Sequence, residues 1–354
     1  MGVRFVDENT VANIARILSG NCDVIDSGTD SSDQSELLLE MDAQGLLNAH
    51  FAPGTVWEHA TFGIGHSGYD DGYQPGSDPP DFFGDARTRQ AIAFCLDRQE
   101  IVDRVWFGQS QVLDTYLPPG HPLFNPDAAR YPYDPPAGMA LLEGVGWYDH
   151  DGDPATPRLA RGIPNVPEGT PLVIDYGSTS SIQRQQVLPL VAESLARCGI
   201  QVNLEHRDAA DFFEVPGSPV FERRFDMVQF AWLAGPDPPC ELFTSENIPG
   251  DPGVLDASGS PRFPRGWQGE NVAGYSSPEF DQACRLAKAT LRGQPEYLEY
   301  HNLAQQIFAQ DLPAVPLYLW TRLVVTRPDL GGLVLDSSHQ SEMWNIEEFD
   351  RLED

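Results

Sequence analysis

The sequence predicts an α/β protein with more than one lobe. Residues 171–207 show a strand–helix–strand pattern, and the run that begins at Phe225 alternates as a strand whose two faces are both largely apolar. Such a strand is expected where both sides of a sheet are covered. A chain of 354 residues is long enough for two or more compact lobes.

The first elements are expected to be a strand, a helix and a second strand over residues 3–25. Asp7 can cap the helix at its start, and Gly20 can end it. The helical periodicity predicts a buried apolar face, which consists of Val11, Ile14, Ile17 and Leu18.

A second helix is expected over residues 32–41. Residues 50–65 follow as an extended run. The next segment, residues 68–85, is rich in Gly, Pro and Asp, which predicts a linker or a crossing between domains.

Three helices are expected between residues 85 and 147. Asp97 and Glu100 form a start similar to a capping box, and a further helix is expected to end near Gly144. The inner face of the helix that begins after Asp97 is expected to hold Ile101, Val105 and Trp106.

The acidic loop that follows carries Asp149, Asp151 and Asp153. This spacing is similar to that of a calcium loop. However, Gly152 is displaced from its position in an EF-hand, and Ala160 stands where the loop needs a glutamate. The pattern therefore favours an ordinary acidic turn.

The strand–helix–strand unit at 171–207 has a polar start to its helix. Three serines and a threonine, from Ser178 to Ser181, crowd this start, where they can cap the helix or hold an anion or a ligand carboxylate. Pro189 is expected to kink the helix unless it lies in the first turn, and Gly199 is expected to end it. The predicted buried face is Val187, Val191 and Leu195.

The stretch from Phe225 to Pro249 is the best candidate for a ligand site. Its strand should stop where Gly235 and three prolines prevent regular pairing. Trp232 and Asp237 would then lie at the carboxyl end of a buried strand, the edge where open α/β sheets bind ligands. The alternative is that Trp232 belongs to the core and Asp237 caps a turn.

Two helices and a strand are expected after a long loop at 250–272. Ser277 and Pro278 suit the first two positions of one helix, and a proline-entered strand follows the second helix from residue 313. The predicted buried residues are Phe280, Cys284 and Ala287 in the first helix and Tyr300, Leu303 and Ile307 in the second.

Composition excludes several classes of partner. The formal net charge of −31 would repel nucleic acids and anionic membranes. No run of 18 apolar residues could span a bilayer. The five cysteines include no CxxC pair and lie near no histidine pair at metal-binding spacing, which argues against a zinc site.

No catalytic motif is recognisable. The sequence contains no GxSxG, Walker or GxGxxG pattern, and the eight histidines are scattered. The residues therefore make no positive case for an enzyme, and no cofactor is expected.

Several segments in order resemble family 5 of the extracellular solute-binding proteins, the peptide and nickel receptors of ABC importers. They are RFVDENTVANIARILSGNCDVI, DARTRQAIAFCLDRQEIVDRVWFGQ, YLPPG, YPYDPPAGMALLEGVGW, ENVAGYSSPEFDQACRLA and LAQQIFAQDLPAVPLYL. The resemblance implies a type II periplasmic-binding-protein architecture, with one complete lobe and part of the other.

The same resemblance implies that the chain is the C-terminal part of a longer receptor. Residues 1–82 would be the end of lobe one with a hinge strand, 83–317 would be lobe two, and 318–354 would return to lobe one. The absence of a signal-peptide pattern would then say nothing against export.

In peptide-binding relatives, the strand that resembles FAWLAG pairs with the ligand backbone. Carried over, the ligand-binding set is Phe230, Ala231, Trp232, Leu233, Gly235 and Asp237, with Ser178 as a further candidate. Relatives have an aspartate where this chain has Gly235, and Asp237 is the nearest acid. They often have Asn after the phenylalanine that matches Phe62, where this chain has Gly63.

The resemblance to a branch of the family also implies a disulfide between Cys240 and Cys284. It implies an extracytoplasmic receptor, expected to be a lipoprotein, with a small-molecule or peptide ligand and with the permease and ATPase subunits of an importer as partners. A sensory or chaperone-like receptor and, with less support, a hydrolase remain as alternatives.

Overall fold

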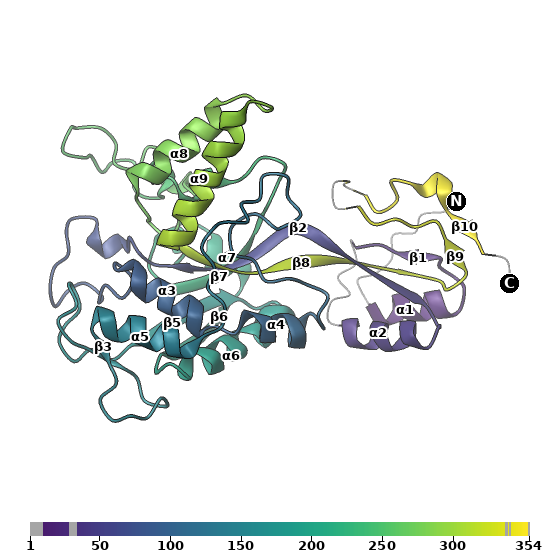
Figure 1. Ribbon diagram of the computed structural model, residues 1–354, viewed down its shortest axis with the longest axis horizontal. Helices are drawn as coiled ribbons and strands as arrows, with labels where there is room; N and C mark the ends of the chain where they lie inside the picture. The colour runs from purple at the N-terminus through teal and green to yellow at the C-terminus, as the bar shows by residue number, and fades with distance from the viewer. Residues whose placement is uncertain (1–9, 28–33, 337–338, 340, 353–354) are drawn as a thin grey trace. The chain divides into compact units, whose positions relative to one another are not determined.

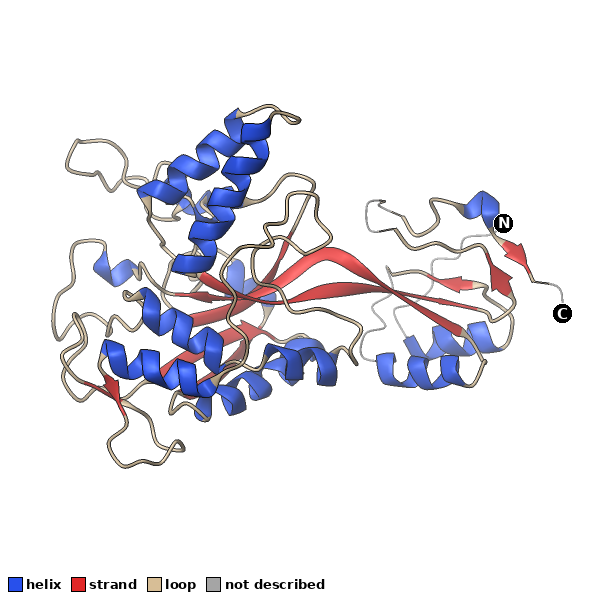
Figure 2. Cartoon of the chain, viewed as in Figure 1, coloured by secondary structure: helices blue, strands red, loops and turns tan. Residues whose placement is uncertain are grey.

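The computed structural model describes residues 10–27, 34–336, 339 and 341–352 (Figures 1 and 2). Its α-helices are α1 (Thr10–Leu18), α2 (Ser35–Ala43), α3 (Ala86–Cys95), α4 (Arg98–Val105), α5 (Pro135–Val145), α6 (Ile182–Ala196), α7 (Ala209–Phe213), α8 (Pro278–Ala289) and α9 (Pro295–Asp311). Its strands are β1 (Val24–Ile25), β2 (Asn48–Phe62), β3 (Trp147–Tyr148), β4 (Leu159–Ala160), β5 (Val173–Thr179), β6 (Gln201–Arg207), β7 (Met227–Leu233), β8 (Ala314–Thr326), β9 (Leu330–Gly331) and β10 (Asp350–Arg351).

The main sheet has six strands in the order β1-β8-β2-β7-β5-β6. β5 and β6 run parallel around α6, which confirms the strand–helix–strand unit predicted from the sequence. β7 runs parallel to β5 and antiparallel to β2, so it is an interior strand of a mixed sheet in an α/β fold.

The chain divides into two compact units. Unit 1 comprises residues 1–55, 101–111 and 319–354, and unit 2 comprises 56–100 and 112–318. The return to unit 1 after residue 318 lies within one residue of the expected boundary. A boundary was also expected at residue 82. The chain instead passes between the units after residues 55, 100 and 111.

Hydrogen bonds explain why residues 63–85 belong to unit 2. The backbone N–H of Gly63 donates to the carbonyl of Asp226 over 2.8 Å, and that of Gly65 donates to Ala273 over 2.9 Å. Arg223 forms an ion pair with Asp70 at 2.5 Å. The Gly- and Pro-rich segment therefore packs within this unit instead of forming a linker.

Residues 101–111, which the sequence placed with lobe two, belong to unit 1. There the ring of Trp106 lies 5.9 Å from that of Trp320, and the N–H of Leu319 donates to Gln111 over 3.1 Å. This assignment depends on partners about 200 residues away in the sequence.

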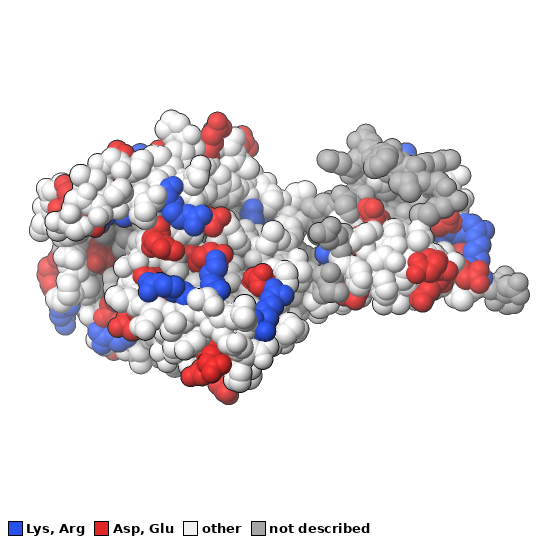
Figure 3. Space-filling view, turned by 90° about the horizontal axis from the view of Figure 1, so that it is seen from above, with Lys and Arg blue, Asp and Glu red and all other residues white. Residues whose placement is uncertain are grey.

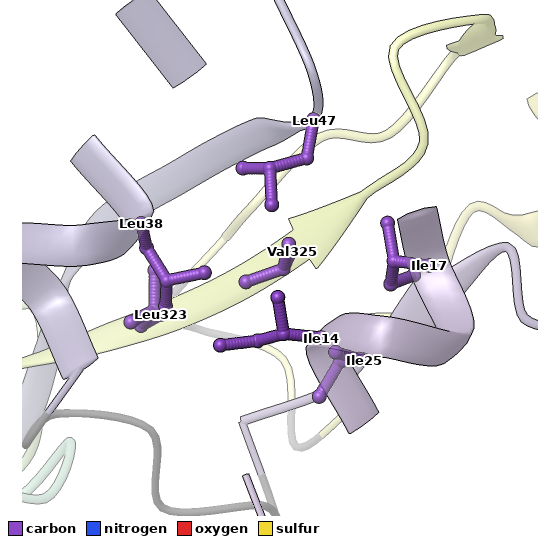
Figure 4. Packing of buried hydrophobic residues seen from close by; sticks show 7 residues of the cluster. All are labelled: Ile14, Ile17, Ile25, Leu38, Leu47, Leu323 and Val325. Atoms are coloured by element: carbon purple, nitrogen blue, oxygen red, sulfur yellow. The ribbon is translucent and has the colours of Figure 1, made fainter. Parts of the chain in front are cut away.

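Unit 1 has its own apolar core, in which side chains from α1, α2, β1 and β8 point toward one another (Figure 4). Ile14 and Ile17 are buried as predicted, but Val11 is 63% exposed and Leu18 is 46% exposed. α1 therefore buries a narrower strip than its apolar periodicity indicates. Asp7, the predicted cap, and residues 32–33 of the predicted second helix lie outside the described residues. The core consists of Ile14, Ile17, Ile25, Leu38, Leu47, Leu323 and Val325.

Most helix boundaries in unit 2 follow local signals. Asp97 accepts a hydrogen bond from the backbone N–H of Glu100 over 2.9 Å, and Ser277 caps α8 through the N–H of Phe280. Pro189 lies inside α6, past its first turn, and the helix continues through it to Ala196.

The predicted buried face of α9 is wrong. Leu303 is 42% exposed, and Tyr300 and Ile307 are half-buried. The helix instead buries two polar residues, His301 and Gln305, with Ala304, Phe308 and Ala309. The Gln305 amide is satisfied there by the carbonyl of Leu123 over 2.7 Å. An internal hydrogen bond thus permits a polar residue on the buried face, which apolar periodicity alone does not predict.

Two disulfides link elements of unit 2. Cys240, which begins a 3₁₀ turn after β7, is joined to Cys284 of α8, the pair that the family resemblance implied. Cys95 of α3 is joined to Cys198 after α6, a bridge that the sequence analysis did not anticipate. In Figure 1, α8 lies alongside α9, with which it packs closely.

Positive and negative side chains are interspersed on the face of unit 2 seen in Figure 3, although the net charge is strongly negative. Within the described part of the chain, no helix combines the length and apolar character needed to cross a bilayer.

Candidate functional site

The candidate site is built on the last four residues of β7. On one side, β2 pairs with β7 along its whole length, from Phe62 opposite Met227 to Val56 opposite Leu233. On the other side, β5 pairs only with residues 227–229. Among the described residues, no strand pairs with residues 230–233 on that side, so their backbone edge is open.

A recess lies beside this end of β7. Phe230 and Trp232 form one wall, and His59 and Thr61 of the neighbouring β2 form another. The remaining lining residues come from the chain after β7 and are Leu242, Phe243, Glu270, Val272 and Ala273. Strand alternation explains the first two pairs, because residues two apart in a strand face the same side.

His59 is a buried, neutral imidazole in this recess. Its ring centroid lies 4.5 Å from that of Trp57 and 4.5 Å from that of Phe230, its cross-strand partner. Its Nδ1 lies 2.8 Å from the hydroxyl of Thr61. Burial lowers the pKa of His59 to about 3, and the nearby guanidinium of Arg184 acts in the same direction.

A network of hydrogen bonds between buried side chains joins β7 to its neighbours. Glu58 of β2 accepts from the Nε of Arg184 over 2.7 Å and from the side-chain amide of Gln229 over 3.0 Å. The hydroxyl of Tyr176 donates to the amide oxygen of Gln229 over 2.7 Å. Side chains from β2, β5, β7 and α6 are thereby held in one arrangement.

The structure brings some of the predicted ligand residues together at this site. Phe230 and Trp232 both line the recess, and Trp232 is only partly buried, so it is not simply a core residue. Ala231 and Leu233 lie on the open edge of β7, and Leu233 is 61% exposed.

Ser178 does not lie at the helix N-terminus, where the sequence placed it. It belongs to β5 and is fully buried, and its hydroxyl donates to the carbonyl of Gln229 over 2.9 Å. Ser181 caps α6 instead, through the N–H of Arg184. Ser178 therefore holds β5 to β7 and has no position from which to bind a ligand.

Asp237 is exposed and forms an ion pair with Arg292. A hydrogen bond from Arg292 lowers the pKa of this carboxyl. Because a cation already accompanies it, Asp237 is a weaker candidate for binding a cationic ligand than its position after the strand indicated.

The structure treats Gly63 and Gly235 differently, the two positions where the family resemblance implied Asn and Asp. A Cβ at Gly63 would lie 2.1 Å from the carbonyl oxygen of Phe225, so a side chain cannot fit there without a backbone shift. A Cβ at Gly235 would meet only the carbonyl of Asp237 at 3.9 Å. Packing therefore requires glycine at position 63, whereas it leaves room for a side chain at position 235.

Two groups of possible metal ligands occur among the described residues. In the first, Cys240 and Cys284 are joined to each other, which leaves Glu241. The second is the exposed turn at Asp149, His150 and Asp151. There Asp149 accepts from the N–H of Gly152 over 2.7 Å and Asp151 from that of Asp153 over 3.0 Å, which is the acidic turn expected from the sequence.

Among the lining residues that were not predicted from the sequence, the three polar ones are His59, Thr61 and Glu270. The alternation of Trp57, His59 and Thr61 along β2 carried a usable signal, because it places all three on one face. Glu270 carried none, since its place in the recess depends on the fold of the loop after β7.

Comparison with known proteins gives a consistent set of matches. Residues 2–250 match the family described as bacterial extracellular solute-binding proteins, family 5 middle. The chain is 24% identical over 265 residues to di/tripeptide-binding protein 2 of Pseudomonas aeruginosa, covering 74% of this chain and 41% of that protein. It is 23% identical over 274 residues to the oligopeptide-binding protein AppA of Bacillus subtilis, covering 76% and 44%.

A solved structure with the same fold is the oligopeptide-binding protein of Thermus thermophilus in complex with a pentapeptide. The TM-score is 0.68 at 25% identity, and the match covers 94% of this chain and 53% of that one. The chain therefore spans about half the length, or less, of the relatives it matches.

Proposed function

This chain belongs to family 5 of the bacterial extracellular solute-binding proteins, and from that premise we propose that it captures an extended, peptide-like polar solute for an ABC importer. It acts as a receptor and not as an enzyme. Unit 2 is lobe two, the ligand-binding lobe, and unit 1 belongs to lobe one. The full protein works outside the cytoplasmic membrane, as a lipoprotein, and delivers its solute to permease and ATPase subunits.

The open backbone edge at residues 230–233 is the observation that carries this proposal. An extended ligand can add to such an edge as a further strand, with the N–H and C=O groups of Ala231 and Leu233 as partners. The buried network around Glu58 keeps this edge rigid, which reduces the ordering cost of binding.

The recess beside the edge supplies side-chain contacts. Trp232 offers a large aromatic surface at low conformational cost, as is common for residues that dominate binding. Two named relatives support the solute class, since one is called di/tripeptide-binding and the other oligopeptide-binding.

Mass spectrometry of the purified protein under native conditions tests the proposal. We expect it to retain a peptide or a similarly extended solute and, after release, to rebind that compound in calorimetry without altering it. Chemical conversion of the retained compound would point to an enzyme. Failure to retain any solute, together with failure to bind members of a random short-peptide mixture, would overturn receptor function for this class.

A further inference from the structure

We propose that a second pocket of unit 2 binds a small organic carboxylate, whose charge is held by Arg130 and Tyr133. This pocket shares no lining residue with the recess beside β7, so the proposal does not depend on solute capture there. Its volume is about 330 Å³. Pockets that enclose a drug-sized ligand measure roughly 300–1,000 Å³, so this one has room for a small aromatic or aliphatic acid. The lining residues are Leu96, Arg98, Gln99, Val112, Asp114, Arg130, Pro132 and Tyr133.

Two guanidinium groups at this pocket share one carboxylate. Asp114 lies 3.7 Å from the Nη2 of Arg98 and 3.5 Å from the Nε of Arg130. No other carboxylate lines the pocket among the described residues, so it carries a surplus of positive charge in a protein whose net charge is −31. A ligand anion in the pocket is attracted by both guanidinium groups, and its attraction is opposed by only one carboxylate.

The charge of Arg98 is buried and incompletely compensated. Its side chain is 6% exposed, and its guanidinium donates to the carbonyls of Pro316 and Tyr131 over 2.8 and 2.7 Å. These carbonyls fix the group in place but carry no net charge. Burial lowers the pKa of Arg98, although Asp114 acts to raise it. A further anion nearby would stabilise a buried cation of this kind.

Arg130 and Tyr133 can donate hydrogen bonds to the ligand. Arg130 is 57% exposed, and its hydrogen bond to the carbonyl of Pro126, over 3.0 Å, uses one N–H of the guanidinium. The planar guanidinium can pair with a carboxylate through two parallel N–H groups. The phenol oxygen of Tyr133 accepts from the Nη1 of Arg197 over 3.0 Å. That bond uses a lone pair, so the hydroxyl of Tyr133 remains a donor.

The rest of the lining favours an organic anion over an inorganic one. Leu96, Val112 and Pro132 supply an apolar surface beside the charged groups. The backbone of Val112 is fixed by an antiparallel bridge to Tyr318 of β8. An apolar ligand body that covers these side chains removes them from water, whereas a small inorganic ion leaves them exposed.

Calorimetry at pH 7 with benzoate, acetate, benzyl alcohol and benzylamine tests the site. We expect the protein to bind benzoate about tenfold or more tightly than each of the other three. Acetate lacks the apolar body, benzyl alcohol lacks the charge, and benzylamine carries the opposite charge. Failure to bind benzoate, or equal binding of benzoate and any of the other probes, would overturn the proposal.

Three variants assign the binding to this pocket. Arg130→Gln should abolish the preference for benzoate, whereas Arg265→Gln, which removes an exposed arginine outside the pocket, should preserve it. Asp114→Asn removes the carboxylate that competes with the ligand, so it should tighten benzoate binding severalfold. A benzoate preference that persists in Arg130→Gln, or weaker binding in a folded Asp114→Asn protein, would contradict the assignment. Because Asp114 also faces the buried Arg98, circular dichroism first checks that this variant is folded, and the Arg130→Gln result stands without it.

Discussion

The Nε of Arg184 on α6 lies 2.7 Å from a carboxylate oxygen of Glu58 on β2, and the two side chains are 11% and 0% exposed. The pair joins the helix that covers the sheet to the strand beside β7. Because neither charge is well solvated, each requires the other.

Removing the charge of one partner of this ion pair should therefore lower the free energy of unfolding. Glu58→Gln leaves the guanidinium of Arg184 buried without its counter-charge, and we expect the free energy of unfolding to fall by about 3–5 kcal/mol. Replacing both residues, as in Glu58→Gln with Arg184→Met, should recover much of this loss. Urea denaturation of the three variants measures the difference, and a single variant as stable as the wild type would contradict it.

Trp232→Ala should weaken solute binding more than it weakens the fold. Trp232 lines the recess and is only partly buried, so we expect the affinity for the retained solute to fall by about 2 kcal/mol. Trp267→Ala provides a matched control, because Trp267 is 39% exposed and does not line the recess. Unchanged calorimetric affinity in a folded Trp232→Ala protein would show that the solute binds elsewhere.

The two disulfides should contribute unequally to stability. They close loops with sequence separations of 103 residues for Cys95–Cys198 and 44 for Cys240–Cys284. In the chain-entropy treatment they stabilise the fold by about 4.7 and about 4 kcal/mol, respectively.

Double Cys→Ala variants of each bridge, compared by urea denaturation, test this order. Non-reducing peptide mapping should find Cys22 as the alkylated thiol, since it is the free cysteine of the chain. Alkylation of Cys240 and Cys284 in oxidised wild-type protein would refute the second bridge.

His59 should make the protein less stable in acid. Its pKa in the folded state is about 3, below the ordinary value of 6.5. Between these two pH values the unfolded chain binds a proton at His59 and the folded chain does not. The contribution of His59 to the free energy of unfolding is fully present above pH 6.5. It is lost as the pH falls toward 3, by up to about 1.4 kcal/mol per pH unit.

His59→Gln does not titrate and can keep the hydrogen bond to Thr61, so its free energy of unfolding should fall less steeply over the same range. The comparison cancels contributions from other groups, among them Asp226, whose pKa burial raises to about 6. Parallel curves for the two proteins would exclude His59 as the source.

Local signals in the sequence predicted much of the fold. Asp97, Ser277 and Gly199 act within one turn of a helix, so their roles depend on their immediate neighbours. The family resemblance predicted the pairing of Cys240 with Cys284. The face of α9 was mispredicted because the hydrogen bonds of Gln305 make a polar residue stable in the core.

The strand that ends at Leu233, and the position of Trp232 near that end, could be predicted from the order of residues alone, because alternation and the following glycine and prolines act along the chain. The surroundings of Trp232 could not be predicted in this way. His59 and Glu270 are separated by more than 200 residues, and Asp237 meets Arg292 across a loop. Burial and charge pairing depend on distances in space, and these are set only when the strands and loops come together.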